Sequence, residues 1–150
     1  MALANMTQEQ TDNENREHCK RIAEELEAYT EGKIYKCPIC GELYSIDDAE
    51  ETEDGHKCPA CDEEIEDGDE EQQSLYDYFN DVFDIEYRIS GNREFRSVQI
   101  MVACGGPNIY IDTGTAQVEL YWWTDRASYP ISYNARDEID AYFEDLYNCM

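Results

Sequence analysis

The stretch Cys37-Pro38-Ile39-Cys40-Gly41, together with Cys58-Pro59-Ala60-Cys61, decides the fold of the first half of the chain, and seventeen residues separate Cys40 from Cys58. Two Cys-x-x-Cys knuckles can surround one tetrahedral ion at about 2.3 Å per Zn–S bond. Four cysteines leave no open coordination position for a substrate. The spacing therefore predicts one structural Zn²⁺ per chain, bound by Cys37, Cys40, Cys58 and Cys61. The alternative is a pair of redox-active dithiols.

Short apolar segments around the knuckles predict a zinc ribbon over residues 34–66, with strands at 34–36 and 43–46. In front of it, apolar residues recur at helical spacing between residues 7 and 30, and Gly32 follows them. This pattern predicts an N-terminal helix within residues 1–33. We expect His18 and Cys19, which lie on this helix, to be an ordinary surface pair, because a second metal site would need more ligands.

Acidic residues dominate the chain, with 36 Asp and Glu against 11 Lys and Arg and a formal net charge of −25. Such a charge argues against a nucleic-acid backbone or an anionic membrane as a direct partner and favours a basic protein surface. The acids are densest between residues 47 and 71, where Lys57 is the one base. Residues 67–73 are expected to form an acidic linker. The candidate partner-binding carboxylates are those of Asp47, Asp48, Glu50, Glu51, Glu53, Asp54, Glu63, Glu64, Glu66 and Asp67. The alternative is that the whole run is only solvated.

The second half, residues 74–150, predicts a helix, a four-stranded antiparallel meander and a C-terminal helix. Apolar residues recur at helical spacing from Leu75 to Phe83. Alternating segments then predict strands at 84–89, 95–104, 108–112 and 117–123, joined by hairpin turns. Asn134 is the expected cap of the last helix. The fold class is therefore α+β: helix, ribbon, helix, meander, helix.

The predicted strands have one apolar face and one mixed face. Val98, Ile100 and Leu120 belong to the apolar face, together with Trp122, which is expected in the core because strand neighbours point in opposite directions. The opposite face carries Tyr110, Tyr121 and Trp123. It is too aromatic for a plain solvent face, so it is either a partner surface or is covered by another part of the chain.

The sequence offers few candidate catalytic residues, and we expect a protein that is not an enzyme. Only two histidines are present, and Gly105-Gly106-Pro107-Asn108 lacks the Gly-Lys-Ser/Thr ending of a phosphate loop. Cysteine usage fits a reducing compartment, and the sequence has neither a basic leader nor a long apolar run. These features predict a cytoplasmic protein.

The stretch from Gly105 to Thr113, with Val118-Glu119-Leu120-Tyr121-Trp122-Trp123, resembles a family of small acidic proteins from bacterial phages and mobile elements. The resemblance covers roughly residues 74–147. It implies an anti-CRISPR or antirestriction role in a bacterial cytoplasm, in which a DNA mimic inhibits a defence nuclease by occupying its basic nucleic-acid channel. Two alternatives stay open: a zinc-ribbon adaptor that uses the aromatic sheet face, and a zinc-dependent nucleic-acid binder.

Overall fold

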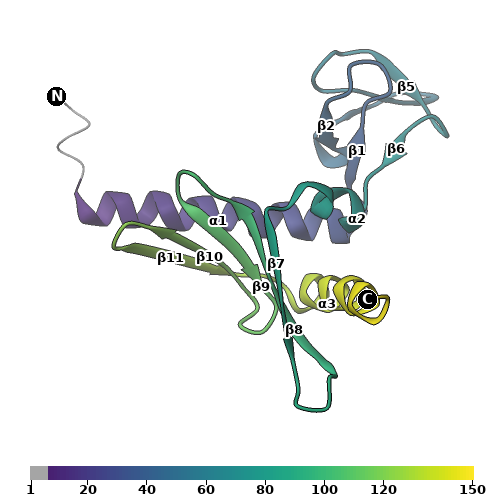
Figure 1. Ribbon diagram of the computed structural model, residues 1–150. Coiled ribbons are helices and arrows are strands. Elements are labelled where there is room, and N and C mark those ends of the chain that lie inside the picture. Colours follow the sequence, from purple (N-terminus) through teal and green to yellow (C-terminus); the bar gives the residue numbers. More distant parts are fainter. Residues whose placement is uncertain (1–6) are drawn as a thin grey trace. The chain divides into compact units, whose positions relative to one another are not determined.

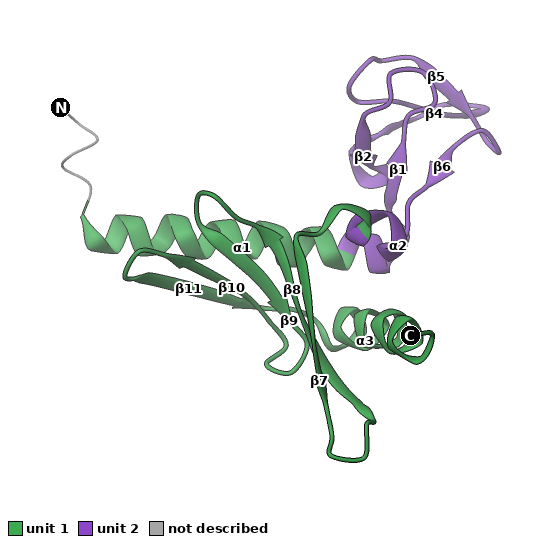
Figure 2. Cartoon of the chain, viewed as in Figure 1, with its two compact units in different colours: residues 1–27, 80–150 green, residues 28–79 purple. Residues whose placement is uncertain are grey.

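A computed structural model describes residues 7–150, and in it the chain forms two compact units (Figures 1 and 2). Unit 1 contains the residues up to Glu27 and those from Asn80 onward, and unit 2 contains Ala28–Phe79. The helix α1 (Gln8–Thr30) lies mostly in unit 1 and ends in unit 2. Among the described residues, no helix is both long and apolar enough to cross a membrane.

Unit 1 is built on a five-stranded antiparallel sheet with the order β11-β10-β9-β8-β7. Each strand pairs with the next one along the chain, as a meander requires. The strands are β7 (Asp84–Ile89), β8 (Phe95–Ala103), β9 (Asn108–Asp112), β10 (Gln117–Trp122) and β11 (Asp125–Pro130).

The fifth strand, β11, corrects the prediction of four strands. The chain reverses between Trp122 and Asp125, which face each other in the register, so the turn consists of Trp123 and Thr124. Trp123 takes the left-handed φ of 56° there. Such turns normally contain Gly, Asn or Asp, and their absence left β11 without a sequence signal.

The core of unit 1 lies between one face of the sheet and two helices. The helix α3 (Tyr133–Asn148) covers the β7 side, where Phe143 and Tyr147 contact Tyr87. The helix α1 covers the β11 side: Figure 1 shows it running along β10 and β11, and Arg16 lies over the ring of Tyr129. The fully buried side chains include Leu26, Val98, Ile100, Ile109, Ile111, Val118, Leu120, Ile139 and Phe143.

Three local expectations in unit 1 are wrong. Trp122 is 38% exposed instead of buried, because it occupies the last pair of a hairpin. Cys19 is fully buried, since it lies on the core side of α1, so it is not a surface residue. The cap of α3 is Ser132, whose hydroxyl accepts from the N–H of Ala135, and Asn134 is already inside the helix.

Unit 2 contains two small three-stranded sheets. The first has the order β2-β1-β6 and consists of β1 (Ile34–Lys36), β2 (Leu43–Ser45) and β6 (Glu71–Gln72). The short 3₁₀ helix η2 (Ile46–Asp48) then leads to the second sheet, with the order β3-β4-β5. Its strands are β3 (Glu50–Glu51), β4 (Gly55–Lys57) and β5 (Glu64–Glu66).

The end of unit 2 differs from the simple helix expected after residue 74. The helix α2 (Leu75–Tyr78) has one turn and continues as the 3₁₀ helix η3 (Phe79–Asp81). Leu75 and Phe79 are buried as expected, but Phe83 is exposed. The helix has ended before this residue, and the backbone N–H of Phe83 instead bonds to the carbonyl of Met101 on β8. The segment expected as a linker contains β6, which pairs with β1 through Lys36 and Glu71.

Candidate metal centre

The four predicted cysteines come together in unit 2. Their sulfur atoms all lie within 4.8 Å of one another. The Sγ atoms of Cys37 and Cys61 are 3.8 Å apart, and those of Cys40 and Cys58 are also 3.8 Å apart. A tetrahedron with metal–sulfur bonds of 2.3 Å has an edge of about 3.8 Å, so the four thiols fit one tetrahedral metal ion.

The two knuckles are built on the same plan. In the first, the N–H of Cys37 donates to the carbonyl of Glu42 at 2.9 Å, and in the second, the N–H of Cys58 donates to that of Glu63 at 3.0 Å. Each turn closes with a backbone bond back to its first cysteine, from Gly41 to Cys37 and from Asp62 to Cys58. The pattern Lys-Cys-Pro-x-Cys-x-Glu occurs twice in the sequence, and the cysteine spacing alone did not reveal this repeat.

Left-handed backbone conformations end both knuckles. Gly41 has a φ of 80° and Asp62 has a φ of 61°. The first position was expected, because glycine adopts this region without steric cost. The second shows that Asp62 takes the same conformation despite its side chain, which aspartate tolerates better than most residues. The two turns therefore end with the same backbone conformation.

Backbone N–H groups stabilise the thiolate of Cys37. Burial opposes ionisation of this thiol, but the N–H groups of Cys40 and Ile39, both 3.4 Å from its sulfur, outweigh the burial and lower the pKa to about 7. The thiolate is the form that binds a metal ion. The first knuckle is thus arranged for ligation before any metal–sulfur bond is counted.

A small core lies beside the four sulfurs and joins the two sheets of unit 2. The hydroxyl of Tyr44, on β2, is hydrogen-bonded to Nε2 of His56, on β4, and both side chains are buried. Tyr35 stacks against Tyr44 with ring centroids 6.2 Å apart, and Ile65 is buried in the same cluster. Burial raises the pKa of Tyr44 to about 12. This pair therefore holds the ribbon together and is not an exposed acid–base group.

The predicted acidic residues lie on the surface of unit 2. Every carboxylate residue between 47 and 71 is exposed except Glu70, which is half-buried. Unit 2 as a whole has seventeen acidic residues against Lys33, Lys36 and Lys57. Asp47 forms an ion pair with Lys33 at 3.0 Å. Five of the fourteen carboxylate residues lie on the paired strands β3, β5 and β6: Glu50, Glu51, Glu64, Glu66 and Glu71.

Four of these carboxylates gather around a concave surface of unit 2. A cavity of about 510 Å³ is lined by Asp47, Glu51, Asp67 and Glu70, with Tyr35 and His56 among its other lining residues. Asp47 and Glu51 come from the segment before the second knuckle, and Asp67 and Glu70 come from the segment after it. The ribbon fold thus joins two acidic segments that are sixteen or more residues apart in the sequence.

The three predicted aromatic residues lie in unit 1 and differ in exposure. Trp123 is 88% exposed at the tip of the β10–β11 hairpin. Tyr110 and Tyr121 are half-buried and contact each other edge to face at 5.9 Å, and the hydroxyl of Tyr121 donates to Glu119 at 2.9 Å. Arg126 lies over the ring of Tyr121. The structure therefore brings the two tyrosines together, whereas Trp123 lies at the turn, where its ring contacts that of Trp122 edge to face at 5.8 Å.

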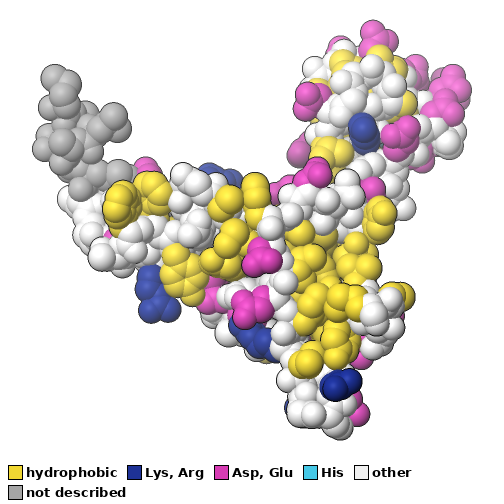
Figure 3. Space-filling view, viewed as in Figure 1, with side chains coloured by type: hydrophobic (Ala, Val, Ile, Leu, Met, Phe, Trp, Pro, Cys, Tyr) yellow, Lys and Arg dark blue, Asp and Glu magenta, His cyan; other side chains and the backbone are white. Residues whose placement is uncertain are grey.

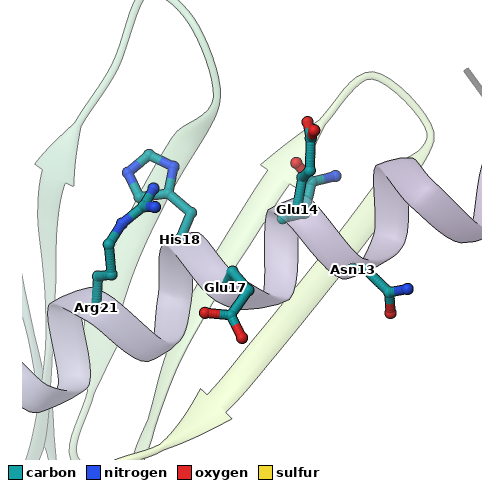
Figure 4. Close-up of a pocket in the computed structure, with 6 residues that line it drawn as sticks. Asn13, Glu14, Glu17, His18 and Arg21 are labelled. Atoms are coloured by element: carbon teal, nitrogen blue, oxygen red, sulfur yellow. The ribbon is translucent and has the colours of Figure 1, made fainter.

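A second concave surface, of about 440 Å³, lies along α1 (Figure 4). Its lining residues, including Glu14, Glu17, His18 and Arg21, all belong to this one helix. Partial burial and the neighbouring Arg21 lower the pKa of His18. The lining of this surface is polar.

No known protein family, curated protein or solved structure matches this chain. The resemblance to acidic phage proteins therefore stays a prediction.

Proposed function

We propose that this protein binds a basic protein surface through the acidic face of unit 2, with one Zn²⁺ in the four-cysteine site holding that face in shape. The observation that carries the proposal is the fixed, exposed array of carboxylates between residues 47 and 71. Carboxylates on paired strands lose little conformational freedom on binding, unlike those on a flexible tail. The array is therefore a binding surface in this proposal, and not only a solvated run.

Zinc is the metal that the donor set favours. Four thiolates in a tetrahedral arrangement suit Zn²⁺ or iron. Of these two metals, Zn²⁺ has no redox chemistry, which suits a purely structural site. Four thiolates and one Zn²⁺ add two negative charges to unit 2, which strengthens its attraction for a basic partner. With all four positions occupied by sulfur, the ion has a structural role.

The most specific form of the proposal is inhibition of a nuclease by imitation of nucleic acid. Rigidly placed carboxylates can take the positions of phosphates in a basic channel, and a strongly acidic surface steers association with such a channel. The inhibitor would then compete with DNA or guide RNA, and salt would weaken it strongly. A defence nuclease of the CRISPR or restriction type is the proposed target.

The test compares two variants that lose the same number of negative charges. One carries Asp47→Asn, Asp48→Asn, Glu50→Gln and Glu51→Gln, and the control carries Glu9→Gln, Asp12→Asn, Glu14→Gln and Glu17→Gln on α1. Proteins captured from a nuclease-treated bacterial lysate are identified, and any captured nuclease is assayed for inhibition. The proposal expects the unit 2 variant alone to lose capture and inhibition while keeping its zinc.

A second candidate function is an adaptor that uses the hairpin tip of unit 1, and the exposure of Trp123 favours it. A tryptophan that is 88% exposed is a typical anchor of protein interfaces. If Trp123→Ala and Tyr121→Ala abolish capture while the four-carboxylate variant retains it, the adaptor replaces the mimic.

A further inference from the structure

The strand β7 is an open edge of the five-stranded sheet. It pairs with β8 on one side, and the strand order ends with it. The opposite edge, β11, is modified in ways that discourage further pairing: it ends with Pro130, and Asp125 binds the side chain of Gln8 at 2.8 Å. β7 has six residues and no proline, although three of the six are charged and its pairing with β8 shifts register between Arg88 and Ile89. Its outward N–H and C=O groups are therefore a template for another strand.

Apolar side chains accompany this edge. Phe83 is 61% exposed just before β7, Ile89 is 46% exposed at its end, and Leu146 of α3 is 39% exposed. Figure 3 shows hydrophobic side chains gathered over β7 and the neighbouring part of α3. On a protein with a net charge of −25, an apolar cluster along an unpaired strand is a surface that favours burial.

The sequence of β7 is complementary to itself when it is read in the opposite direction. In an antiparallel pair, the side chains of facing residues lie on the same side of the sheet. A two-fold axis that relates two identical strands keeps this arrangement only if one residue of the strand faces its own copy across the axis. With Tyr87 at the axis, Glu86 faces Arg88 of the second copy, and Ile85 faces Ile89 of the second copy. Both kinds of pair are favourable across strands, and symmetry makes each occur twice.

We propose that two copies of this chain associate through β7, in antiparallel orientation about Tyr87, so that their sheets join into one. The occupant of the open edge is thus a second copy of the same protein. The neighbouring registers are worse: an axis at Glu86 places two glutamates face to face, and an axis at Ile85 places Asp84 against Glu86 of the second copy. Like charges that face each other across strands are destabilising.

The two side chains of the charged pair differ in how they lie in the single chain. Glu86 is exposed on β7. Arg88 donates to both oxygens of Asp112, at 2.8 and 2.7 Å, and this bidentate contact fixes its rotamer while 45% of the side chain stays exposed. Asp112 lies on β9, beyond β8, so the guanidinium is directed away from the open edge and pairs with Glu86 of the second copy only after it turns away from Asp112. The register about Tyr87 therefore rests first on the two Ile85–Ile89 pairs and on keeping like charges apart.

Sedimentation equilibrium of the zinc-loaded full chain tests this dimer. At about 0.15 M salt the Debye length is about 8 Å, so most of the repulsion between the acidic surfaces is screened. We expect a monomer–dimer equilibrium for the wild type. Glu86→Arg places two arginines face to face, and Ile89→Lys puts charge into the apolar pair. Each should raise the dimer dissociation constant about tenfold or more, since each change counts twice.

The matched control is Glu14→Arg, which makes the same charge change on α1 and should leave the dissociation constant within about twofold. Far-UV circular dichroism and zinc content verify that each variant is folded. Arg126→Glu examines the other edge and should also have no effect. A wild type that stays monomeric up to roughly 200 μM, a dimer insensitive to residues 86 and 89, or a dimer that Arg126→Glu dissolves would overturn the proposal.

Discussion

The two units of this protein are held together by different means. Unit 1 buries the apolar faces of five strands and two helices, including Leu120, Ile139 and Phe143, all fully buried. Unit 2 has a much smaller core, in which Tyr44 and Ile65 pack beside Cys37 and Cys58. A unit of this size buries little apolar surface, and in the proposed zinc-bound form metal ligation would supply the missing free energy. One chain thus combines a unit with a large hydrophobic core and a unit with a small core and four candidate metal ligands.

The two units also differ in their balance of charge. Unit 2 has seventeen acidic residues and three lysines, whereas the larger unit 1 has nineteen acidic residues and eight basic ones. Repulsion among the carboxylates of unit 2 destabilises its compact state. The proposed Zn²⁺ would therefore offset both a small core and this repulsion. Loss of a cysteine ligand should therefore affect unit 2, and loss of a core side chain should affect unit 1.

Removal of one metal ligand should have the largest effect. Cys40→Ser is expected to unfold unit 2, because structural Zn²⁺ supplies about 10–16 kcal/mol in small zinc domains. Unit 1 should stay folded. Zinc analysis and limited proteolysis measure this, and Cys104→Ser is the control, because Cys104 is exposed and outside the cluster. Loss of the unit 1 sheet signal in Cys40→Ser would show that the two units fold together.

Truncation of the unit 1 core comes next. Phe143→Ala should lower the free energy of unfolding of unit 1 by about 3–5 kcal/mol, because it leaves a cavity under α3. Chemical denaturation followed by circular dichroism measures the loss, and the zinc content of unit 2 should not change. Trp122→Ala should cost clearly less, since this side chain is partly exposed. Equal losses in the two variants would contradict the assignment of Trp122 to the hairpin end.

The Arg88–Asp112 pair should contribute an intermediate, pH-dependent amount. Burial of Asp112 raises its pKa, but the hydrogen bonds from Arg88 and from the backbone N–H groups of Thr115 and Gly114 outweigh burial and hold the pKa below its usual value. Asp112→Asn should cost about 1–3 kcal/mol at neutral pH, because a charged hydrogen-bond partner is lost.

The sign of the pH effect follows from the lowered pKa. A carboxylate with a depressed folded-state pKa stabilises the fold above its unfolded pKa of about 3.9 and loses this contribution as the pH falls through the folded value. The difference in unfolding free energy between wild type and Asp112→Asn should therefore be constant above about pH 5 and shrink below about pH 4. A difference that persists unchanged at pH 2 would argue against the ionised pair.

The smallest effects are expected at the knuckle ends. Gly41→Ala should weaken unit 2 by about 1 kcal/mol, because the added Cβ meets no neighbour within 4 Å and only the left-handed backbone resists it. Asp62→Gly relieves the same conformational cost at the second knuckle and should be neutral or slightly stabilising. Competition with a zinc chelator measures both. A loss of zinc affinity in Asp62→Gly would indicate that the carboxylate itself supports the site.

Sequence reasoning was strongest where the constraint is local. The Cys-x-x-Cys spacing predicted which four residues come together, because two short turns fix two thiols each and one tetrahedral site suits both pairs. Period-two alternation predicted β7 to β10 and the burial of residues such as Ile100 and Leu120. Composition predicted an acidic surface, since carboxylates in such numbers cannot be buried.

What only the tertiary structure decided depends on contacts between distant segments. β11 forms because its backbone completes a hairpin whose turn, Trp123 and Thr124, has no local signature. Cys19 is buried because α1 lies against the sheet, although its neighbours in sequence are polar. Asp67 and Glu70 meet Asp47 and Glu51 because the ribbon joins the two acidic segments around one cavity. Local patterns specify which residues prefer which conformation, whereas pairing across long separations depends on the free energy of the whole packed unit.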